Sequence, residues 1–198
     1  GFNNGTRLLQ YITNGDKSYE ATVVLGAATV TDDVEGEIIS RADVSAITDA
    51  QIEAEMAKMR GTIMQRPSSV SAVKVDGERA YDRVRAGESV ELAAREVTIS
   101  QLDIKDVRRI ESAIEVDIEV TCSAGTFIRA IARDCGNALA VGGHLNSLRR
   151  TRVAGFGLDK SISLTALKAG EYSTLGLVDV ARTTFSAREL ALDEVNEL

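Results

Sequence analysis

The chain has 198 residues, of which 44% are hydrophobic, and its 23 Lys and Arg against 30 Asp and Glu give a formal net charge of −7. This composition supports a folded domain with a sizeable core and argues against disorder. The acidic balance argues mildly against nucleic-acid binding, although a local basic stripe can outweigh the average charge. Two cysteines and one histidine give neither a disulfide framework nor a convincing zinc site, which indicates a reducing, cytoplasmic compartment. No stretch approaches the roughly 20 apolar residues of a membrane span, so no membrane association is expected.

The start of the chain is expected to alternate short helices with strands. Residues 6–12 have a helical pattern that Asn14 and Gly15 close. Residues 17–26, KSYEATVVLG, are rich in β-forming side chains and predict a strand. The next segment, AATVTDDVEG, is acidic and predicts a solvated polar loop, after which EIIS resumes a short strand.

A helix with a clear start signal follows. Thr48 and Gln51 have the spacing of a capping box. Ile52, Met56 and Met59 recur at helical spacing, which predicts one apolar face. Gly61 is expected to end this helix.

The middle of the chain is divided by Pro67 and by a turn signal at Asp76-Gly77. Strands are expected on both sides of the proline, and residues 78–85 predict a short helix. Residues 90–123 are rich in strand formers. Within them, SAIEVDIEVT alternates apolar and polar residues, which predicts a half-buried strand with one wet face.

A second long helix is expected over residues 126–140. Its apolar stripe contains Ile128, Ile131, Cys135 and Leu139. LRRTRVAGFGL then predicts a strand pair, and SLTALKAG predicts a final short helix. Because helices and strands do not alternate regularly, the sequence predicts an α+β fold with a mixed, largely antiparallel sheet and flanking helices.

Common catalytic motifs do not occur in this sequence, neither a P-loop nor a nucleophile elbow nor HExxH. His144 is expected to be structural, and Cys122 and Cys135 are expected to be core thiols. Arg129 stands out because it interrupts the apolar run FIRAIA, and burying a guanidinium costs several kcal/mol unless a carboxylate meets it. Either Arg129 reaches water or an acid pairs with it.

Basic residues gather around the predicted turn and just past the second long helix, at Lys74, Arg79, Arg149, Arg150 and Arg152. Each group alone fits a solvated charged face. In an acidic chain, however, their clustering indicates a segregated positive surface that suits phosphate. Tyr19 and Phe127 lie beside apolar runs and fit either the core or a platform on which a base stacks.

Several segments together resemble the TruB family of tRNA pseudouridine synthases. The matching stretches, in order, are KSYEATVVLG, the acidic step at residues 28–35, RPSSVSAVKVDGERAYDRVRAG, CSAGTFIRAIARDCGNAL and GGHLNSLRRTRVAGF. The resemblance runs from Gly1 to about Asp179. The pair formed by the last two stretches is its most specific part.

The resemblance implies a reaction that needs no cofactor and no metal. Family members convert the uridine at position 55 in the T loop of tRNA to pseudouridine. The glycosidic bond to N1 is broken, the base rotates, and a new bond forms at C5. The nucleophile is an aspartate in a G-H-x-G-x-L-D-P motif, which this sequence does not contain.

Roles for individual residues also follow from the resemblance. Arg129 matches the arginine that pairs with the catalytic aspartate and lowers its pKa, so its partner is expected outside this chain. Tyr19 matches the tyrosine that stacks on the target base and helps to remove the C5 proton. Phe127 and Leu148 match residues that contact the base. Asp33 matches an acidic residue near the site, although Val30 replaces a polar residue of the usual pattern.

The resemblance also carries expectations about organisation and partners. Residues 1–180 are expected to form part of a catalytic domain and residues 181–198 to begin a C-terminal region, with the nucleophile motif and an RNA-binding PUA-like domain lying outside the chain. This portion alone is expected to be inactive. The expected partner is the T-arm of tRNA, bound by a monomer, with the basic residues as backbone contacts. A non-catalytic module that binds or folds tRNA, and an unrelated scaffold with solvated arginines, are the alternatives.

Overall fold

The computed structural model describes residues 1, 3–68, 74–75, 78–79 and 92–188. The chain divides into two compact units, one of Gly1–Gly15 with Arg152–Leu198 and one of Asp16–Thr151. The second, larger unit contains the sheet and the two longest helices.

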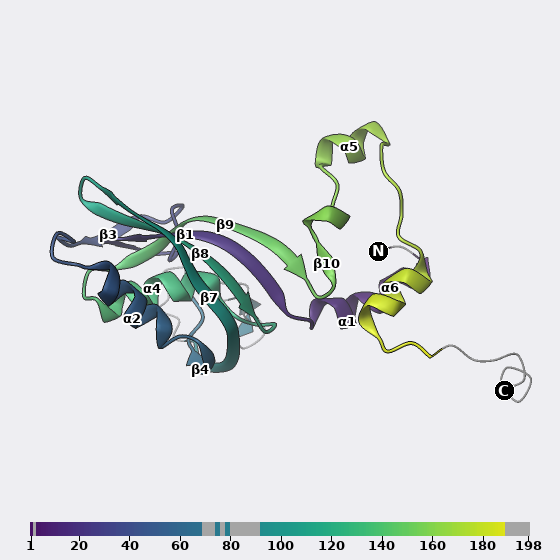
Figure 1. Cartoon of the computed structure of the whole chain (residues 1–198), viewed down its shortest axis with the longest axis horizontal. Coiled ribbons are helices and arrows are strands. Elements are labelled where there is room, and N and C mark those ends of the chain that lie inside the picture. The colour runs from purple at the N-terminus through teal and green to yellow at the C-terminus, as the bar shows by residue number, and fades with distance from the viewer. Residues whose placement is uncertain (2, 69–73, 76–77, 80–91, 189–198) are drawn as a thin grey trace, which may run out of the picture. The chain divides into compact units, whose positions relative to one another are not determined.

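The larger unit is built on a sheet with strand order β9-β1-β8-β7-β4 (Figure 1). The strands are β1 (Lys17–Leu25), β4 (Gly61–Gln65), β7 (Arg95–Ile110), β8 (Ala113–Cys122) and β9 (Gly143–Val153). β1 pairs with β8, β8 with β7, and β7 with β4, all antiparallel. The predicted α+β fold with a largely antiparallel sheet is confirmed.

The alternation of side chains in β8 gives the sheet one buried face. Ile114, Val116, Ile118 and Val120 are at most 1% exposed, whereas the residues between them are half-buried. Successive residues of a strand point to opposite faces, so the apolar set lies on one face and the charged set on the other. The prediction of a half-buried strand is confirmed.

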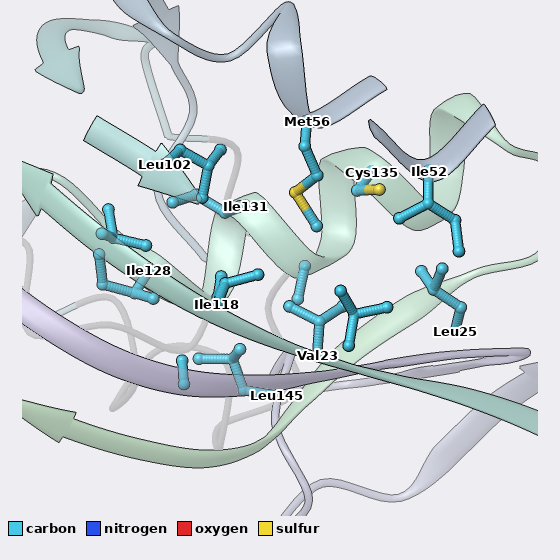
Figure 2. Packing of buried hydrophobic residues seen from close by; sticks show 14 of the residues in the cluster. Val23, Leu25, Ile52, Met56, Leu102, Ile118, Ile128, Ile131, Cys135 and Leu145 are labelled. Atoms are coloured by element: carbon cyan, nitrogen blue, oxygen red, sulfur yellow. The ribbon is translucent and has the colours of Figure 1, made fainter. Parts of the chain in front are cut away.

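Two helices, α2 (Asp49–Ala57) and α4 (Ile128–Ala138), cover the apolar face. Thr48 caps α2, and its reciprocal hydrogen bonds with Gln51 form the predicted capping box. Figure 2 shows Met56 of α2 and Ile131 of α4 among the side chains of the strands. Both residues are fully buried, and burying a side chain of this size stabilises the fold by about 1.5–3 kcal/mol. This core fixes α4 on the sheet.

A short hairpin follows β1. It consists of β2 (Ala27–Thr29) and β3 (Ile38–Arg41), which pair antiparallel on either side of the acidic turn at residues 30–37. Farther along, β5 (Lys74–Val75) pairs with β6 (Glu78–Arg79). The predicted helix over residues 78–85 is therefore wrong at its first two positions. The other residues of that helix, and the turn at Asp76-Gly77, lie outside the described residues.

The smaller unit consists of short elements. They are η1 (Asn3–Leu8), α1 (Leu9–Thr13), β10 (Phe156–Gly157), η2 (Leu158–Lys160), α5 (Leu164–Ala169) and α6 (Leu177–Thr184). β10 pairs with the end of β9, which confirms the predicted strand pair. The helix α5 was predicted and α6 was not. Within the described part of this unit no residue is fully buried.

Candidate functional site

The N-terminus of α4 is held by a side chain from β4. Phe127 precedes the first helical residue and provides no side-chain cap. Instead, the Phe127 backbone N–H donates to Gln65 Oε1 at 2.8 Å, and Gln65 Nε2 donates to the Phe127 carbonyl at 3.0 Å. Gln65 is 2% exposed. A buried amide therefore satisfies both backbone groups of Phe127 and fixes the turn of helix that carries Arg129.

Arg129 forms an ion pair inside this chain. Its Nη2 lies 2.6 Å from Asp33 Oδ2, and the two side chains are 39% and 13% exposed. The carboxylate partner of Arg129 was expected to lie outside the chain. The structure shows that Asp33, inside the chain, is a carboxylate partner of Arg129. A guanidinium has five N–H donors, so this contact is compatible with a second acceptor on Arg129.

The carboxylate of Asp33 is oriented by its own turn. Its Oδ1 accepts hydrogen bonds from the Thr31 hydroxyl at 2.5 Å and from the Glu35 backbone N–H at 3.1 Å. The Thr29 hydroxyl donates to the Asp33 carbonyl at 2.7 Å. Oδ1 thus closes the turn while Oδ2 faces Arg129. The hydrogen bonds to Oδ1 hold the carboxylate in one orientation toward the guanidinium.

The acidic turn is fastened to the start of β9. The Leu145 N–H donates to the Asp32 carbonyl at 3.0 Å, and the Val34 N–H donates to the Leu145 carbonyl at 2.8 Å. Asp32 and Asp33 are each only 9% exposed. The prediction of a solvated loop is therefore wrong for the two aspartates, which the turn carries inward at the edge of the sheet, whereas Val30, Val34, Glu35 and Glu37 of the same turn are exposed.

A second arginine of α4 meets the other aspartate. Arg133 Nη1 lies 3.3 Å from Asp32 Oδ2. Burial raises the pKa of the Asp32 carboxyl, and the neighbouring Ser68 hydroxyl and Arg133 guanidinium oppose that rise. Arg129 and Arg133 are four positions apart on one side of the helix, so adjacent aspartates of one turn bind adjacent arginines of one helix.

Tyr19 lies near the beginning of β1 and is half-buried against the core. Burial raises the pKa of its phenol, and hydrogen bonding to Arg150 on the neighbouring strand β9 opposes the rise. The ring is therefore a neutral phenol at physiological pH. Arg150, predicted as a contact to the RNA backbone, is brought to the Tyr19 hydroxyl.

The other predicted residues are more dispersed. Leu148 on β9 is 47% exposed. Arg149 lines a shallow hollow of about 570 Å³ with Glu20, Lys105 and Asp117. Arg152 belongs to the smaller unit and donates from Nη1 to the Ala154 carbonyl at 2.6 Å. For Lys74 and Arg79 the structure describes the backbone of β5 and β6, while their side chains lie outside the description.

The histidine and the two cysteines are buried in the interior of the larger unit. His144 is buried, with Nδ1 2.9 Å from the Ala27 carbonyl. Cys122 and Cys135 are buried free thiols, and burial raises the pKa of Cys135 to about 12. The predictions for all three residues are confirmed. The described residues contain no cluster of His, Cys, Asp and Glu suited to a metal ion, and none of their helices has the length and apolar character needed to span a membrane.

Sequence reasoning gave no role in the site to three of its residues. Gln65, Asp32 and Arg133 all fix α4 or the acidic turn through contacts with distant parts of the chain. Arg133 follows Arg129 by four positions, which places both on one side of the predicted helix and was a usable signal for Arg133. Nothing in the sequence near Gln65 indicates that it binds the end of a helix.

Comparison with known proteins assigns the chain to a family. Residues 1–128 match the model of the TruB family pseudouridylate synthase N-terminal domain, and residues 129–178 match the tRNA pseudouridylate synthase B C-terminal domain. The chain belongs to the TruB family. The resemblance seen in the sequence is therefore confirmed.

Individual relatives agree with this assignment. The chain is 50% identical to the tRNA pseudouridine synthase B of Arthrobacter sp. (strain FB24) over 200 residues, which cover 100% of this chain and 65% of that protein. It is 50% identical to the enzyme of the same name from Mycobacteroides abscessus, covering 99% of this chain and 66% of that protein. The chain thus spans slightly less than two thirds of the length of these relatives.

Solved structures show a similar fold. A chain in a Cbf5-Nop10-Gar1 complex aligns with a TM-score of 0.55 and 24% identity, over 90% of this chain and 44% of that one. A chain of an H/ACA RNP bound to a substrate RNA containing 2'-deoxyuridine aligns with a TM-score of 0.53 and 21% identity, over 90% and 42% of the two chains. These alignments show that the chain shares its fold with these two proteins.

Proposed function

We propose that this protein converts the uridine at position 55 in the T loop of tRNA to pseudouridine. The observation that carries the proposal is the match of residues 1–178 to TruB family models, together with about 50% identity to proteins named tRNA pseudouridine synthase B. The Arg129–Asp33 pair adds a site-level argument. A guanidinium fixed in a partly buried position suits a reaction that needs an ionised carboxylate beside a base.

In this mechanism Arg129 keeps the aspartate nucleophile charged. That aspartate belongs to the family motif not found in this sequence, so the proposal concerns the protein at the length of its relatives. A neighbouring guanidinium lowers a carboxyl pKa by about 1–3 units. Because Asp33 already pairs with Arg129, we expect Arg129 to lower the pKa of the nucleophilic aspartate by an amount near the lower end of this range. The pairing with Asp33 weakens the electrostatic effect of Arg129 but fixes the orientation of its side chain.

Tyr19 is assigned to hold the flipped uracil. Base stacking on an aromatic ring contributes about 1–3 kcal/mol, which offsets part of the few kcal/mol needed to take a base out of its stack. The raised pKa of Tyr19 makes a phenolate base uncommon at neutral pH, so stacking and a hydrogen bond oriented by Arg150 are its main roles. Any transfer of the C5 proton to Tyr19 would have to be coupled to loss of its own proton.

The remaining contacts are assigned from chemistry and family position. Phe127 and Leu148 border the uracil, while the tRNA backbone is bound by basic side chains: Lys74, Arg79, Arg149, Arg150 and Arg152. The whole-chain charge of −7 does not oppose this, because phosphate contacts depend on local charge. We further infer that the protein acts as a monomer in the cytoplasm, binds the T-arm, and needs no metal or cofactor.

A tritium-release assay tests the proposed function. Full-length protein is incubated with unmodified tRNA transcript labelled at C5 of its uridines, since forming the C5 bond expels that hydrogen. A transcript with cytidine at position 55 is the matched control. We expect one equivalent of tritium from the first transcript and none from the second. Binding of tRNA without release would instead identify a binding or folding module, and release that persists from the cytidine transcript would move the target elsewhere.

A further inference from the structure

The segment that leaves β4 is tied to α4 at two separated points. The first tie is the pair of hydrogen bonds between the Gln65 side chain and the backbone of Phe127, at the start of the helix. The second lies farther along α4, where Arg133 Nη2 donates to the Arg66 carbonyl at 2.7 Å and Nη1 contacts the Pro67 carbonyl at 3.4 Å. Two ties along one helix restrict rotation about the helix axis as well as translation.

Arg133 also connects this segment to the acidic turn. The same Nη1 lies 3.3 Å from Asp32 Oδ2, and Nε donates to Asp134 Oδ1 at 2.8 Å. The Arg133 side chain is 20% exposed and that of Asp32 is 12% exposed. One mostly buried guanidinium therefore joins three elements: the end of β4, the acidic turn and α4 itself.

The position of Arg133 relates it directly to the proposed active site. Asp32, which it binds, precedes Asp33, and Asp33 pairs with Arg129 one helical turn before Arg133. Asp32 has a left-handed backbone with φ of 59°, a conformation that is uncommon for non-glycine residues and that aspartate tolerates better than most. The Asp32 side chain contacts Arg133, its carbonyl accepts from the Leu145 N–H and its own N–H donates to the Thr29 carbonyl, so contacts on several sides hold Asp32 in this conformation.

We propose that Arg133 is a positioning residue, which holds the acidic turn and the end of β4 on α4 so that Asp33 and Arg129 meet in a single geometry. It is not a catalytic residue, since it acts through its neighbours. Arginine suits this task because its planar fork binds several acceptors at once, whereas lysine offers one point charge. The inference rests on the proposed function, because it names a further residue needed for that reaction.

The test compares Arg133→Met and Arg133→Lys in the full-length protein, with Arg108→Met as a matched control. Arg108 binds Asp106, Glu115 and Asp117 on the opposite face of the sheet. For Arg133→Met we expect kcat on tRNA, corrected for the folded fraction, to fall by about tenfold or more with KM changed by less than about threefold. Arg133→Lys should recover part of kcat, and Arg108→Met should leave both constants near wild type.

Hydrogen exchange separates failure of this inference from failure of the proposed function. In Arg133→Met, amides of the acidic turn, that of Val34 above all, should exchange faster than in wild type and in Arg108→Met. If wild-type protein makes no pseudouridine, the proposed function fails and the exchange result alone decides whether Arg133 holds the turn. Unchanged kcat per folded molecule, or unchanged exchange at Val34, overturns the inference. If Arg133→Met does not fold, the same two readouts on Arg133→Lys decide in its place.

Discussion

Two arginine–carboxylate clusters lie on opposite faces of the same sheet and differ in their exposure to water. On the open face, Arg108 contacts Asp117 at 2.5 Å and Glu115 at 3.2 Å, with side chains 21–38% exposed. Under α4, the Asp33 and Asp32 side chains are only 13% and 12% exposed, while their partners Arg129 and Arg133 are 39% and 20% exposed, so the clusters differ mainly in the burial of their carboxylates. The residue types are the same, but the environments are not.

The difference in exposure changes what each cluster contributes. On the open face, hydrogen bonding to Arg108 lowers the pKa of Asp117, and water screens the pairs. Under the helix, burial raises the pKa of Asp32 in spite of Arg133. Buried pairs gain little net stability after desolvation, but removing one partner is costly because it strands the other. The cluster under α4 therefore fixes the position of the acidic turn relative to the helix. The cluster on the open face pairs charged side chains that water also solvates.

The largest expected difference between the two clusters is the effect on kcat of replacing an arginine in each. We expect Arg129→Met to lower kcat by about 10²-fold or more, as is typical when a preorganised charge beside the reacting group is removed, while Arg108→Met changes kcat by less than about twofold. Initial rates of tritium release measure both. Circular dichroism should show that each variant keeps the wild-type secondary structure. Near-normal turnover in folded Arg129→Met would refute the electrostatic role of this residue.

Removing hydrogen bonds beside each cluster should give the next largest effect. Gln65→Leu removes both hydrogen bonds to the part-buried backbone of Phe127, whose N–H loses this acceptor while its carbonyl keeps the bond from the Ala130 N–H, and we expect it to lower the free energy of unfolding by about 2 kcal/mol. Thr22→Val on the open face removes bonds to Asp117 and Ser147, where water can replace them, and should cost about 1 kcal/mol or less. Urea unfolding midpoints at constant m-value measure both. Equal losses would mean that burial does not distinguish the two faces.

Local patterns predicted most of the fold. The capping box at Thr48 and Gln51 and the alternation in β8 are signals within a few residues, and both are present in the structure. The expected helix over residues 78–85 failed at Glu78 and Arg79, where cross-strand pairing with Lys74 and Val75 prevails over local preference. The periodicity of a single segment does not show which other segment it pairs with.

The site was harder to predict because its contacts are distant in sequence. Arg129 was found because a charge within an apolar run demands a partner. Asp33 was found by family resemblance, but its pairing with Arg129 was not, since an acidic, glycine-containing stretch also fits a solvated loop. Asp32 and Arg133 are 101 positions apart, and Gln65 and Phe127 are 62 apart. Only the fold brings these residues together.

The smallest expected effect is a difference in pH dependence between the two clusters. The folded-state pKa of Asp117 is lowered, so its ionised form contributes stability that is present above about pH 3.8 and is lost as the pH falls through the folded pKa. The folded-state pKa of Asp32 is raised, so its ionisation destabilises the fold at neutral pH, and this penalty disappears as the pH falls through the folded pKa toward about 3.8.

Asparagine variants isolate these two titrations. Free energies of unfolding are measured from neutral pH to about pH 3 for wild type, Asp32→Asn and Asp117→Asn. As the pH falls, wild type should lose stability relative to Asp117→Asn and gain stability relative to Asp32→Asn. The constant offset of Asp32→Asn includes the altered contact with Arg133, so only the slope with pH bears on the carboxyl. Slopes of the same sign would mean that desolvation does not outweigh the guanidinium at Asp32, and that the buried cluster is an ordinary stabilising ion pair.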